Sequence, residues 1–215
     1  MRNASTYLRA ALLIVLTSPI RLAKRIHRFQ PPPFIASIIE VRILASDFRR
    51  RLQPPEKIIE WSGVNPGMAL LELGCGPGVY TVDLARAVGE EGKVHAVDMQ
   101  QAMIDRLARR LQKPEYTDIT NIQMKLANGY ELPFENESID LVLMVTVLPE
   151  ISDKKKALGE IHRILKPDGI LAVSENFIDV DYPLRRTTKR HCERSGFELV
   201  GVSGSFFNYT MKFKK

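Results

Sequence analysis

Cysteine is scarce in this chain, which contains only Cys75 and Cys192 among its 215 residues. Two thiols are too few for a disulfide framework, and no group of cysteines and histidines has the spacing of a zinc site. We therefore expect no bound metal. The shortage of cysteine is also typical of a reducing compartment, so we place the protein in the cytoplasm.

Long apolar runs are lacking as well. Residues 10–20, between Arg9 and Arg21, form an uncharged stretch of eleven residues. A membrane-spanning helix needs roughly 20 apolar residues, so this stretch is too short to span a bilayer. A secretory signal is conceivable, with Arg2 and Arg9 before an apolar core, but residues 21–25 offer no convincing cleavage site of small residues.

Acidic residues are rare only in the first quarter of the chain. Residues 1–53 contain ten lysines and arginines against Glu40 and Asp47, whereas residues 54–215 contain 21 basic and 23 acidic residues. Such an asymmetry indicates an anionic partner, either a membrane or a nucleic acid. In residues 20–29 an apolar stripe is bordered by cations, as in a helix that lies in a membrane interface. Packing of this helix on its own domain or on another subunit remains an open alternative.

The rest of the sequence alternates between short apolar runs and amphipathic segments, with no internal repeat. We divide the chain into a basic amphipathic helical extension, residues 1–53, and a catalytic or binding domain, residues 54–215. Strands are predicted at 68–73, 93–97, 122–125, 139–145, 170–174, 198–203 and 206–212. Helices are predicted at 34–51, 56–62, 79–88, 101–112, 154–165 and 184–195. This order predicts an α/β fold with a doubly wound, mostly parallel sheet and a closing antiparallel pair of strands.

A glycine-rich turn follows the first predicted strand and opens a helix. Gly74, Gly76 and Gly78 stand there at G-x-G-x-G spacing. Such a turn lets a ligand approach the backbone closely and presents N–H groups at the start of a helix. Taken alone it is weak evidence, because a tight turn without a ligand has the same pattern.

Three further features fall at the carboxyl edge of the predicted sheet. Asp98 ends the second strand, 20 residues after Gly78, where a carboxylate can accept hydrogen bonds from ribose hydroxyls. Asn128 follows the third strand, where its amide could meet an adenine edge. The fourth strand, residues 139–145, ends beside the same crevice. Open α/β sheets bind their ligands at this edge, so the four features together predict a nucleoside site.

These residues resemble the class I S-adenosylmethionine (SAM)-dependent methyltransferases, particularly those that methylate small molecules, quinone precursors and lipids. The resemblance covers about three quarters of the chain, from Pro54 to Lys215. It is carried by Leu71-Glu-Leu-Gly-Cys-Gly-Pro-Gly78, Val97-Asp98-Met99, Glu131-Leu-Pro-Phe134, Ile139-Asp-Leu-Val142 and Glu160-Ile-His-Arg-Ile-Leu-Lys-Pro-Asp-Gly169. It implies a Rossmann-like sheet of seven strands with an antiparallel last strand, SAM as cofactor, and S-adenosylhomocysteine as product.

The resemblance also implies roles for individual residues. Glu72 would orient the methionine part of SAM, Asp98 would bind the ribose hydroxyls, Met99 would pack on adenine, and Asn128 would contact the adenine amine. Relatives commonly carry Asp at the position of Asn128, so an acceptor is kept and a charge is lost. The full expected cofactor set is Glu72, Gly74, Cys75, Gly76, Gly78, Asp98, Met99, Asn128, Gly129, Val145 and Thr146.

A catalytic base is harder to predict. Relatives often have histidines or a Glu-His pair after the fourth strand, whereas this chain reads Pro149-Glu150. A role for histidine at that point therefore cannot be carried over. Methyl transfer needs a base only if the acceptor must first lose a proton. The candidates for a base are Glu150, His191 and Tyr80, and Tyr182 is a further one.

The acceptor remains open at this point. No Asn-Pro-Pro-Tyr-like segment follows the fourth strand, which disfavours methylation of exocyclic amines in DNA or of glutamine. The loop at 175–183 is short, so a substrate cover must come mainly from residues 1–60. We expect a small or amphiphilic, lipid-like acceptor, with the extension resting on the inner face of a membrane. The alternatives are RNA methylation through the basic extension, and SAM binding without catalysis. An NAD dehydrogenase is disfavoured by the glycine spacing and by the lack of a second domain. The sequence does not predict an oligomeric state.

Overall fold

The structure is a computed structural model and describes residues 47–179 and 181–215. Most of the expected basic extension, including the stretch at 10–20, the stripe at 20–29 and all but the end of the helix at 34–51, lies outside the described residues. Within the described residues, no helix has both the length and the apolar character needed to cross a bilayer.

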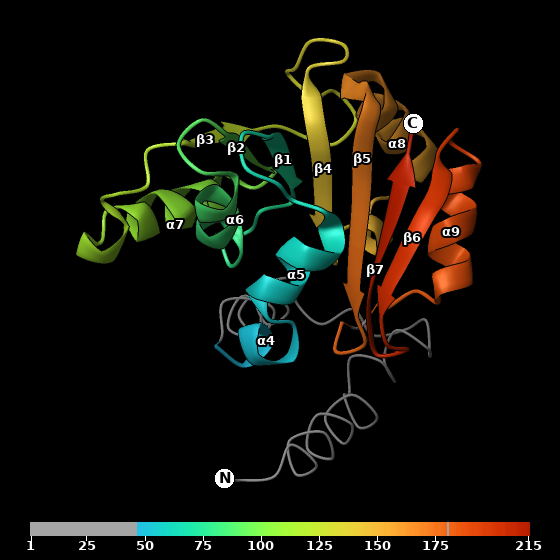
Figure 1. The fold of residues 1–215 in the computed structure, drawn as a ribbon, viewed down its shortest axis with the longest axis horizontal. Helices are drawn as coiled ribbons and strands as arrows, with labels where there is room; N and C mark the ends of the chain where they lie inside the picture. The colour runs from blue at the N-terminus through green and yellow to red at the C-terminus, as the bar shows by residue number, and fades with distance from the viewer. Residues whose placement is uncertain (1–46, 180) are drawn as a thin grey trace, which may run out of the picture.

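The described chain is built on one sheet of seven strands, ordered β3-β2-β1-β4-β5-β7-β6 (Figure 1). The strands are β1 (Ala69–Leu73), β2 (Lys93–Asp98), β3 (Ile122–Leu126), β4 (Ile139–Val145), β5 (Leu165–Asn176), β6 (Glu198–Gly204) and β7 (Asn208–Lys214). The first five pair in parallel, and β7 runs antiparallel to both of its neighbours. This topology confirms the predicted fold class.

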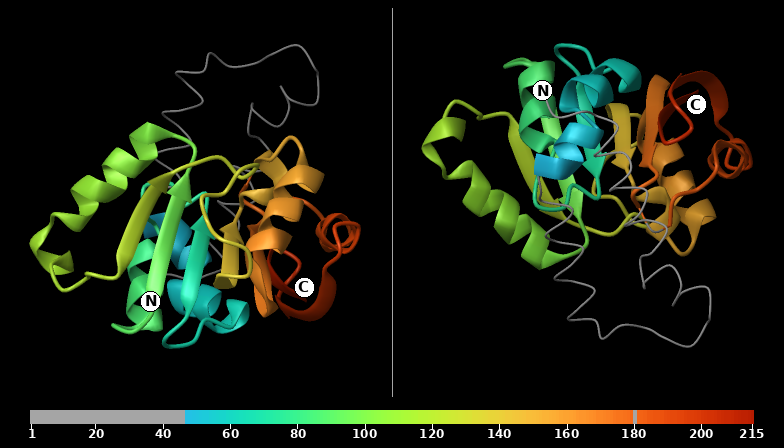
Figure 2. Two further views of the ribbon diagram at one scale, coloured as in Figure 1. Left: turned by 90° about the horizontal axis from the view of Figure 1, so that it is seen from above. Right: turned by 90° about the horizontal axis from the view of Figure 1, so that it is seen from below.

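Helices cover both faces of the sheet. They are α4 (Asp47–Leu52), α5 (Pro55–Ser62), α6 (Thr81–Val88), α7 (Gln101–Leu111), α8 (Lys154–Ile164) and α9 (Arg185–Glu193), with short 3-10 helices at Pro114–Tyr116 and Leu148–Glu150. The sheet positions that pack on α5 and α6 differ from those that pack on α8. These helices therefore lie on opposite faces (Figure 2). Helix α4 lies at the end of the molecule to which β5 points (Figure 1).

Successive side chains of the central strands point to opposite faces of the sheet, so each strand contributes to the hydrophobic core on both faces. Leu70 of β1 packs with α5 and α6, while its neighbour Leu71 belongs to the cluster around α8. Residues 139 and 141–145 of β4 are all buried. A strand buried on both sides reads as a continuous apolar run, and this is why β1 and β4 were evident from the sequence.

Strand β5 differs most from the sequence-based expectation. It was predicted to begin at Ile170 but begins at Leu165, because Leu165 pairs with Ile139 while Ile170 pairs with Leu141, with an irregularity between them. The proline and glycine at 167–169 fall between the predicted helix at 154–165 and the predicted strand at 170–174, and in the structure they lie in this irregular part of the strand. At its other end, β5 includes Glu175, which was expected in a loop. All other predicted ends in the domain lie within two residues of the observed ones.

Candidate active site

An open cleft lies at the carboxyl edge of the sheet, where β1, β2 and β4 end. It encloses about 600 Å³ of space, counting the part that is open to solvent. The turn after β1 forms one wall, and the residues that follow β4 form another. Its lining residues are Arg49, Glu72, Gly74, Cys75, Gly76, Pro77, Val79, Tyr80, Asp98, Gln100, Met103, Val145, Thr146, Val147 and Glu150.

The glycine turn has a backbone that other residues rarely adopt. Gly74, Gly76 and Gly78 have φ angles of 73°, 54° and 80°. A Cβ atom on Gly74 would stand 2.5 Å from Val147, and one on Gly78 would stand 2.4 Å from Leu107. A Cβ atom on Gly76 would meet nothing within 4 Å. The outer glycines therefore allow close packing, while the middle one leaves room at the cleft for a ligand.

The carboxylate of Asp98 is fixed by two backbone donors from different segments. Its Oδ2 atom accepts a hydrogen bond from the N–H of Gly76 at 2.9 Å, and its Oδ1 atom accepts one from the N–H of Gln100 at 2.9 Å. Each carboxylate oxygen can accept more than one hydrogen bond, so both can still receive the hydroxyls of a vicinal diol. The end of β2 is thereby tied to the glycine turn.

Glu72 lies beneath the glycine turn, with its side chain buried. The hydroxyl of Thr81 donates to its Oε2 atom at 2.6 Å. Burial raises the pKa of Glu72 to about 8, and the hydrogen bond from Thr81 opposes this rise. Burial likewise raises the pKa of the Cys75 thiol, with the charges of Glu72 and Asp98 adding to the effect. Cys75 therefore keeps its proton at neutral pH and is not a nucleophile in this state.

The segment after β4 is held in an unusual conformation. Thr146 has a φ angle of 56°, which is rare for a β-branched residue. Its N–H donates to the carbonyl of Ser174 at 2.8 Å, and its Oγ1 accepts a hydrogen bond from Arg49. A strained backbone conformation persists only where contacts with the surrounding residues hold it in place, and such conformations are common at functional sites.

Helix α4 and the residue after it are anchored to the domain by several polar contacts, among them the following three. Arg50 forms a bidentate ion pair with Asp83 of α6, with distances of 2.5 and 3.0 Å. Gln53 is fully buried and donates to the Oγ atom of Ser174 at 2.8 Å. The hydroxyl of Tyr80 donates to the carbonyl oxygen of Gln53 at 3.2 Å. These contacts place Arg49 at the cleft.

The structure brings together most of the residues predicted from the sequence. The expected cofactor residues that line the cleft are Glu72, Gly74, Cys75, Gly76, Asp98, Val145 and Thr146. Gly78 does not line the cleft but packs closely against Leu107 of α7. Met99, directly after Asp98, is 72% exposed. Asn128 and Gly129 do not line the cleft, and the Oδ1 atom of Asn128 accepts the N–H of Tyr130 at 2.9 Å. The individual roles of these residues remain predictions.

The three candidates for a catalytic base differ in position. Glu150 and Tyr80 line the cleft, whereas His191 lies on α9 and does not. Burial raises the pKa of Tyr80, an effect that Arg49 opposes. Tyr80 therefore holds its proton at neutral pH, which does not favour its role as a base. Tyr182 lies outside the cleft lining, in an edge-to-face contact with Phe177.

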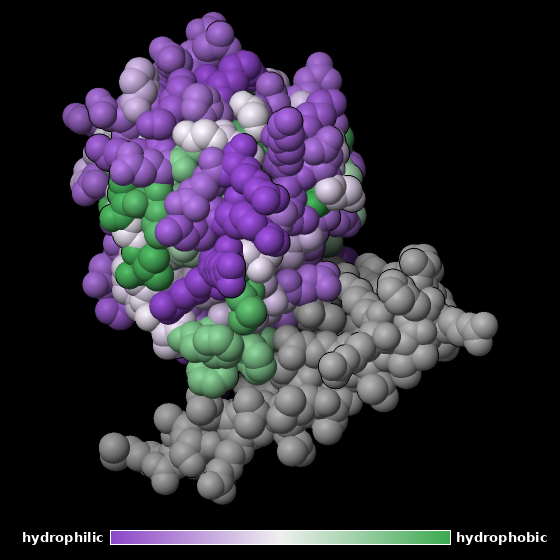
Figure 3. Space-filling model, turned by 90° about the vertical axis from the view of Figure 1, so that its right-hand side faces the viewer, coloured by the Kyte–Doolittle hydropathy of each residue, from purple (hydrophilic) through white to green (hydrophobic). Residues whose placement is uncertain are grey.

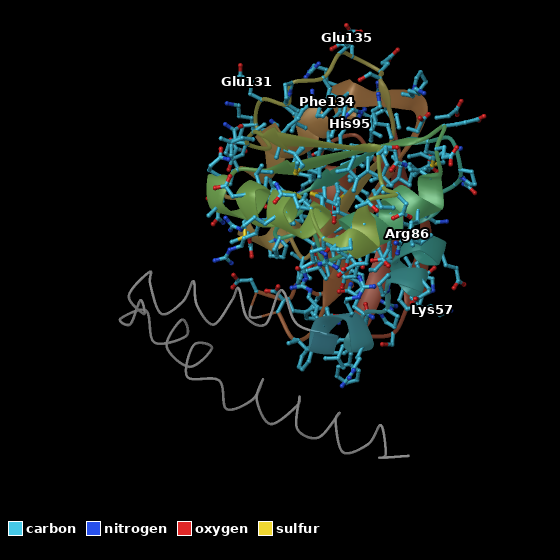
Figure 4. All side chains as sticks on the ribbon, turned by 90° about the vertical axis from the view of Figure 1, so that its left-hand side faces the viewer. Lys57, Arg86, His95, Glu131, Phe134 and Glu135 are labelled. Atoms are coloured by element: carbon cyan, nitrogen blue, oxygen red, sulfur yellow. The ribbon has the colours of Figure 1, made fainter. Side chains whose placement is uncertain are left out.

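The other histidines of the domain also serve packing. His95 of β2 contacts the ring of Phe134 edge to face, with 4.9 Å between the ring centres (Figure 4). Burial lowers the pKa of His95 to about 4, and Lys125 and Lys93 add to this effect. His162 makes a similar contact with Phe197. We assign no catalytic role to either residue.

Sequence reasoning missed several lining residues. Arg49 was assigned to the extension, and no local pattern connects it with Thr146, 97 positions away. Gln100 and Met103 belong to the turn and helix after Asp98, and they could have been found from the expected position of that helix. The missed lining residues are Arg49, Pro77, Val79, Gln100, Met103 and Val147.

The strand order is that of the class I methyltransferase fold. The contact of Gly76 with Asp98 joins the ends of β1 and β2 in this fold. Comparison with known proteins agrees with this. Residues 64–202 match the family described as "Methyltransferase domain", which is well over half of the chain. The chain belongs to this family, and its membership confirms the predicted class, a SAM-dependent methyltransferase, with SAM as the implied cofactor.

Several curated relatives are about one-third identical to this chain over the segments that align. It is 36% identical over 118 residues to 2-phytyl-1,4-naphtoquinone methyltransferase of a Nostoc strain, covering 55% of this chain and 51% of the relative. It is 35% identical over 128 residues to a ubiquinone/menaquinone biosynthesis C-methyltransferase of Vibrio vulnificus, covering 60% of this chain and 48% of the relative. The chain thus spans about half the length of these relatives.

A solved SAM-dependent methyltransferase from Aquifex aeolicus has the same fold. The two structures superpose with a TM-score of 0.74 at 23% sequence identity, over 81% of this chain and 96% of the other. At this identity the likeness bears on the fold alone.

Proposed function

We propose that this chain transfers the methyl group of SAM to a small, amphiphilic ring compound of the quinol type. The observation that carries the proposal is the cleft itself, in which the N–H of Gly76 donates to Asp98 and which Thr146 and Glu150 also line. The names of the quinone methyltransferases among the relatives support the choice of acceptor.

The residues present fit SAM. Gly76 leaves open space at the cleft, Asp98 offers two fixed carboxylate oxygens, and the buried Glu72 lies beneath the turn, where it would orient the methionine part. When bound, SAM supplies an electrophilic methyl group. The protein's part is to align the acceptor with this methyl at close range and to exclude water. Arg49 and Thr146, joined by a hydrogen bond, border the place where the acceptor would lie.

The same edge of the molecule carries exposed apolar side chains, which support an amphiphilic acceptor. Phe206 and Phe207, in the turn between β6 and β7, are 56% and 46% exposed, and Leu184 is 56% exposed. Because β6 and β5 run in the same direction, this turn lies at the carboxyl edge of the sheet, as the cleft does. Apolar side chains gather at the lower end of this face of the molecule, over this hairpin (Figure 3). We propose that this edge, together with the basic extension, rests on the inner face of an anionic membrane.

The methyl acceptor is tested by incubating the protein with isotopically labelled SAM under reducing, oxygen-free conditions. The acceptors to compare are a demethylated naphthoquinol, a lipid amine in vesicles, and bulk RNA. We expect label in the naphthoquinol alone, and mass spectrometry would locate it on the ring. Label in RNA would replace our proposal with the alternative function. SAM binding by calorimetry with no label in any acceptor would favour a protein without catalysis.

Membrane docking is tested by flotation with anionic and neutral vesicles. We expect the full chain to float with anionic vesicles, and a Phe206→Ser, Phe207→Ser double variant to float less. Val202→Ser is the matched control, because Val202 is also exposed but lies within β6, away from the hairpin turn. Equal flotation of all three proteins would count against docking through this edge.

A further inference from the structure

A buried carboxyl group outside the predicted site makes no hydrogen bond with any described residue. Glu175, the second-last residue of β5, is fully buried, and within residues 47–179 and 181–215 neither of its carboxylate oxygens has a hydrogen-bond partner. Leaving a buried polar group unsatisfied costs about 1–3 kcal/mol, and more when the group is charged. Nearly all such groups in native proteins are paired, so each exception calls for an explanation.

The position of Glu175 connects it with the cleft. The preceding residue, Ser174, pairs with Val145 of β4, and its carbonyl oxygen accepts the N–H of Thr146. Glu175 is close enough to Arg49 and Glu150, which both line the cleft, for their charges to affect its pKa. Glu175 itself does not line the cleft, but it lies on the strand beside the end of β4, on the side away from Asp98.

The surroundings of Glu175 favour the protonated, neutral form of its carboxyl group. Burial raises its pKa well above the usual range, the charges of Asp179 and Glu150 add to this, and Arg49 opposes it. Among the described residues, Cys192, Tyr182 and Tyr209 also interact with Glu175, and these three carry no positive charge. A neutral carboxyl group can both donate and accept a hydrogen bond, so it is suited to a neutral oxygen-bearing group and not to a cation.

We propose that Glu175 is the polar end of the acceptor subsite and hydrogen-bonds a ring hydroxyl or carbonyl group of the methyl acceptor. The inference rests on the proposed function, because it assumes that an acceptor enters the cleft beside Thr146. It adds to the proposed function a residue, Glu175, and a class of acceptor, one with a neutral ring oxygen. This oxygen would satisfy the buried carboxyl group of Glu175.

The test compares Glu175→Leu and Glu175→Gln with the wild-type chain. The affinity for 1,4-naphthohydroquinone is measured on protein saturated with S-adenosylhomocysteine, so that binding is seen whether or not methyl transfer occurs. We expect Glu175→Leu to weaken this affinity about tenfold, which corresponds to the loss of one hydrogen bond. Glu175→Gln should recover part of it, because an amide can also donate and accept. The affinity for SAM should not change in either variant.

Thermal unfolding separates this role from a structural one. Removing an orphaned buried carboxyl group should leave the melting temperature unchanged or raise it, whereas removing a structural residue would lower it. Glu198→Gln, an exposed change on β6, is the control for affinity.

Unchanged affinity for the hydroquinone in Glu175→Leu would overturn the inference, as would failure of the wild-type chain to bind it. A lower melting temperature with weaker SAM binding would assign Glu175 to the fold instead. Failure of the wild-type chain to bind SAM would instead refute the proposed function, and the hydroquinone measurement would then be repeated without cofactor product to judge Glu175 by itself.

Discussion

At the scale of single residues, the glycines with positive φ differ in what a side chain would meet. A Cβ atom on Gly76 would point into open space at the cleft, and one on Gly67 would point into open space away from it. Their φ angles, 54° and 81°, both lie in the left-handed region. An alanine at either position is therefore strained by a similar amount, about 1–2 kcal/mol, but only one of them stands where a ligand would lie.

We predict that Gly76→Ala and Gly67→Ala lower the melting temperature to a similar degree, while only Gly76→Ala weakens SAM binding. The loss of affinity should be at least about tenfold, because the added methyl group takes the place of ligand atoms. Differential scanning fluorimetry and titration calorimetry on the same preparations give both quantities. Equal affinities in the two variants would mean that the ligand does not approach Gly76.

Asp98 provides a second prediction at this scale. Asp98→Ala should weaken SAM binding by roughly 10- to 100-fold, the range expected when hydrogen bonds to a charged group are lost. The control is Asp105→Ala, which removes an exposed carboxylate from α7 of the same segment. Calorimetry on both variants checks this. SAM binding at wild-type strength in Asp98→Ala would contradict the assignment of the ribose site.

At the scale of elements, two sequence motifs that were noted separately turn out to contact each other. Arg163 of α8 donates to the carbonyl oxygens of Leu132 and Phe134 and to Glu160, and Glu160 accepts the N–H of Leu132. The sequence contained both motifs, but it did not show that one arginine joins them. Periodicity predicts elements and their faces, whereas long-range polar contacts leave no local pattern.

The early start of β5, at Leu165, was missed for the same reason: it depends on pairing with a distant strand. Proline and glycine at 167–169 have the composition of a turn, and the irregular pairing of β5 with β4 could not be inferred without knowing the partner strand. The part of the cleft that follows β1, β2 and β4 was predictable, because parallel strands bring their carboxyl ends to one edge of the sheet. The acceptor half was not, because Arg49 and Glu175 reach it from α4 and from the end of β5.

Helix α4 is anchored through Arg50, and this gives a third prediction. Arg50→Met should lower stability by roughly 1–2 kcal/mol, because the partly buried Asp83 loses a bidentate partner. It should also weaken SAM binding several-fold, since Arg49 and Tyr80 would lose their support. Arg51→Met, on the exposed side of the same helix, should do neither. Urea unfolding and calorimetry compare the two variants, and equal effects would mean that α4 is not held by this ion pair.

At the scale of the whole molecule, buried ionisable groups determine how stability depends on pH. The pKa of Glu72 is raised to about 8, so between pH 4.5 and pH 8 the folded state binds more protons than the unfolded state, and stability falls as pH rises. Glu175 acts in the same direction. His95 acts oppositely, because its pKa is lowered to about 4 and stability therefore rises between pH 4 and pH 6.5. The effect of His95 therefore opposes that of the two glutamates only below pH 6.5.

We therefore predict that stability falls between pH 6.5 and pH 8, where the histidine no longer contributes. For one carboxyl group such as Glu72, this interval corresponds to about 2 kcal/mol, or a decrease of several degrees in melting temperature. Glu72→Gln keeps the hydrogen bond with Thr81 but cannot ionise, so its melting temperature should depend less on pH in this interval. His95→Gln should change the profile only below pH 6.5, and it is the matched control. A profile of Glu72→Gln parallel to that of the wild-type chain between pH 6.5 and pH 8 would show that Glu72 is already ionised in the folded protein, with its charge balanced within the cleft.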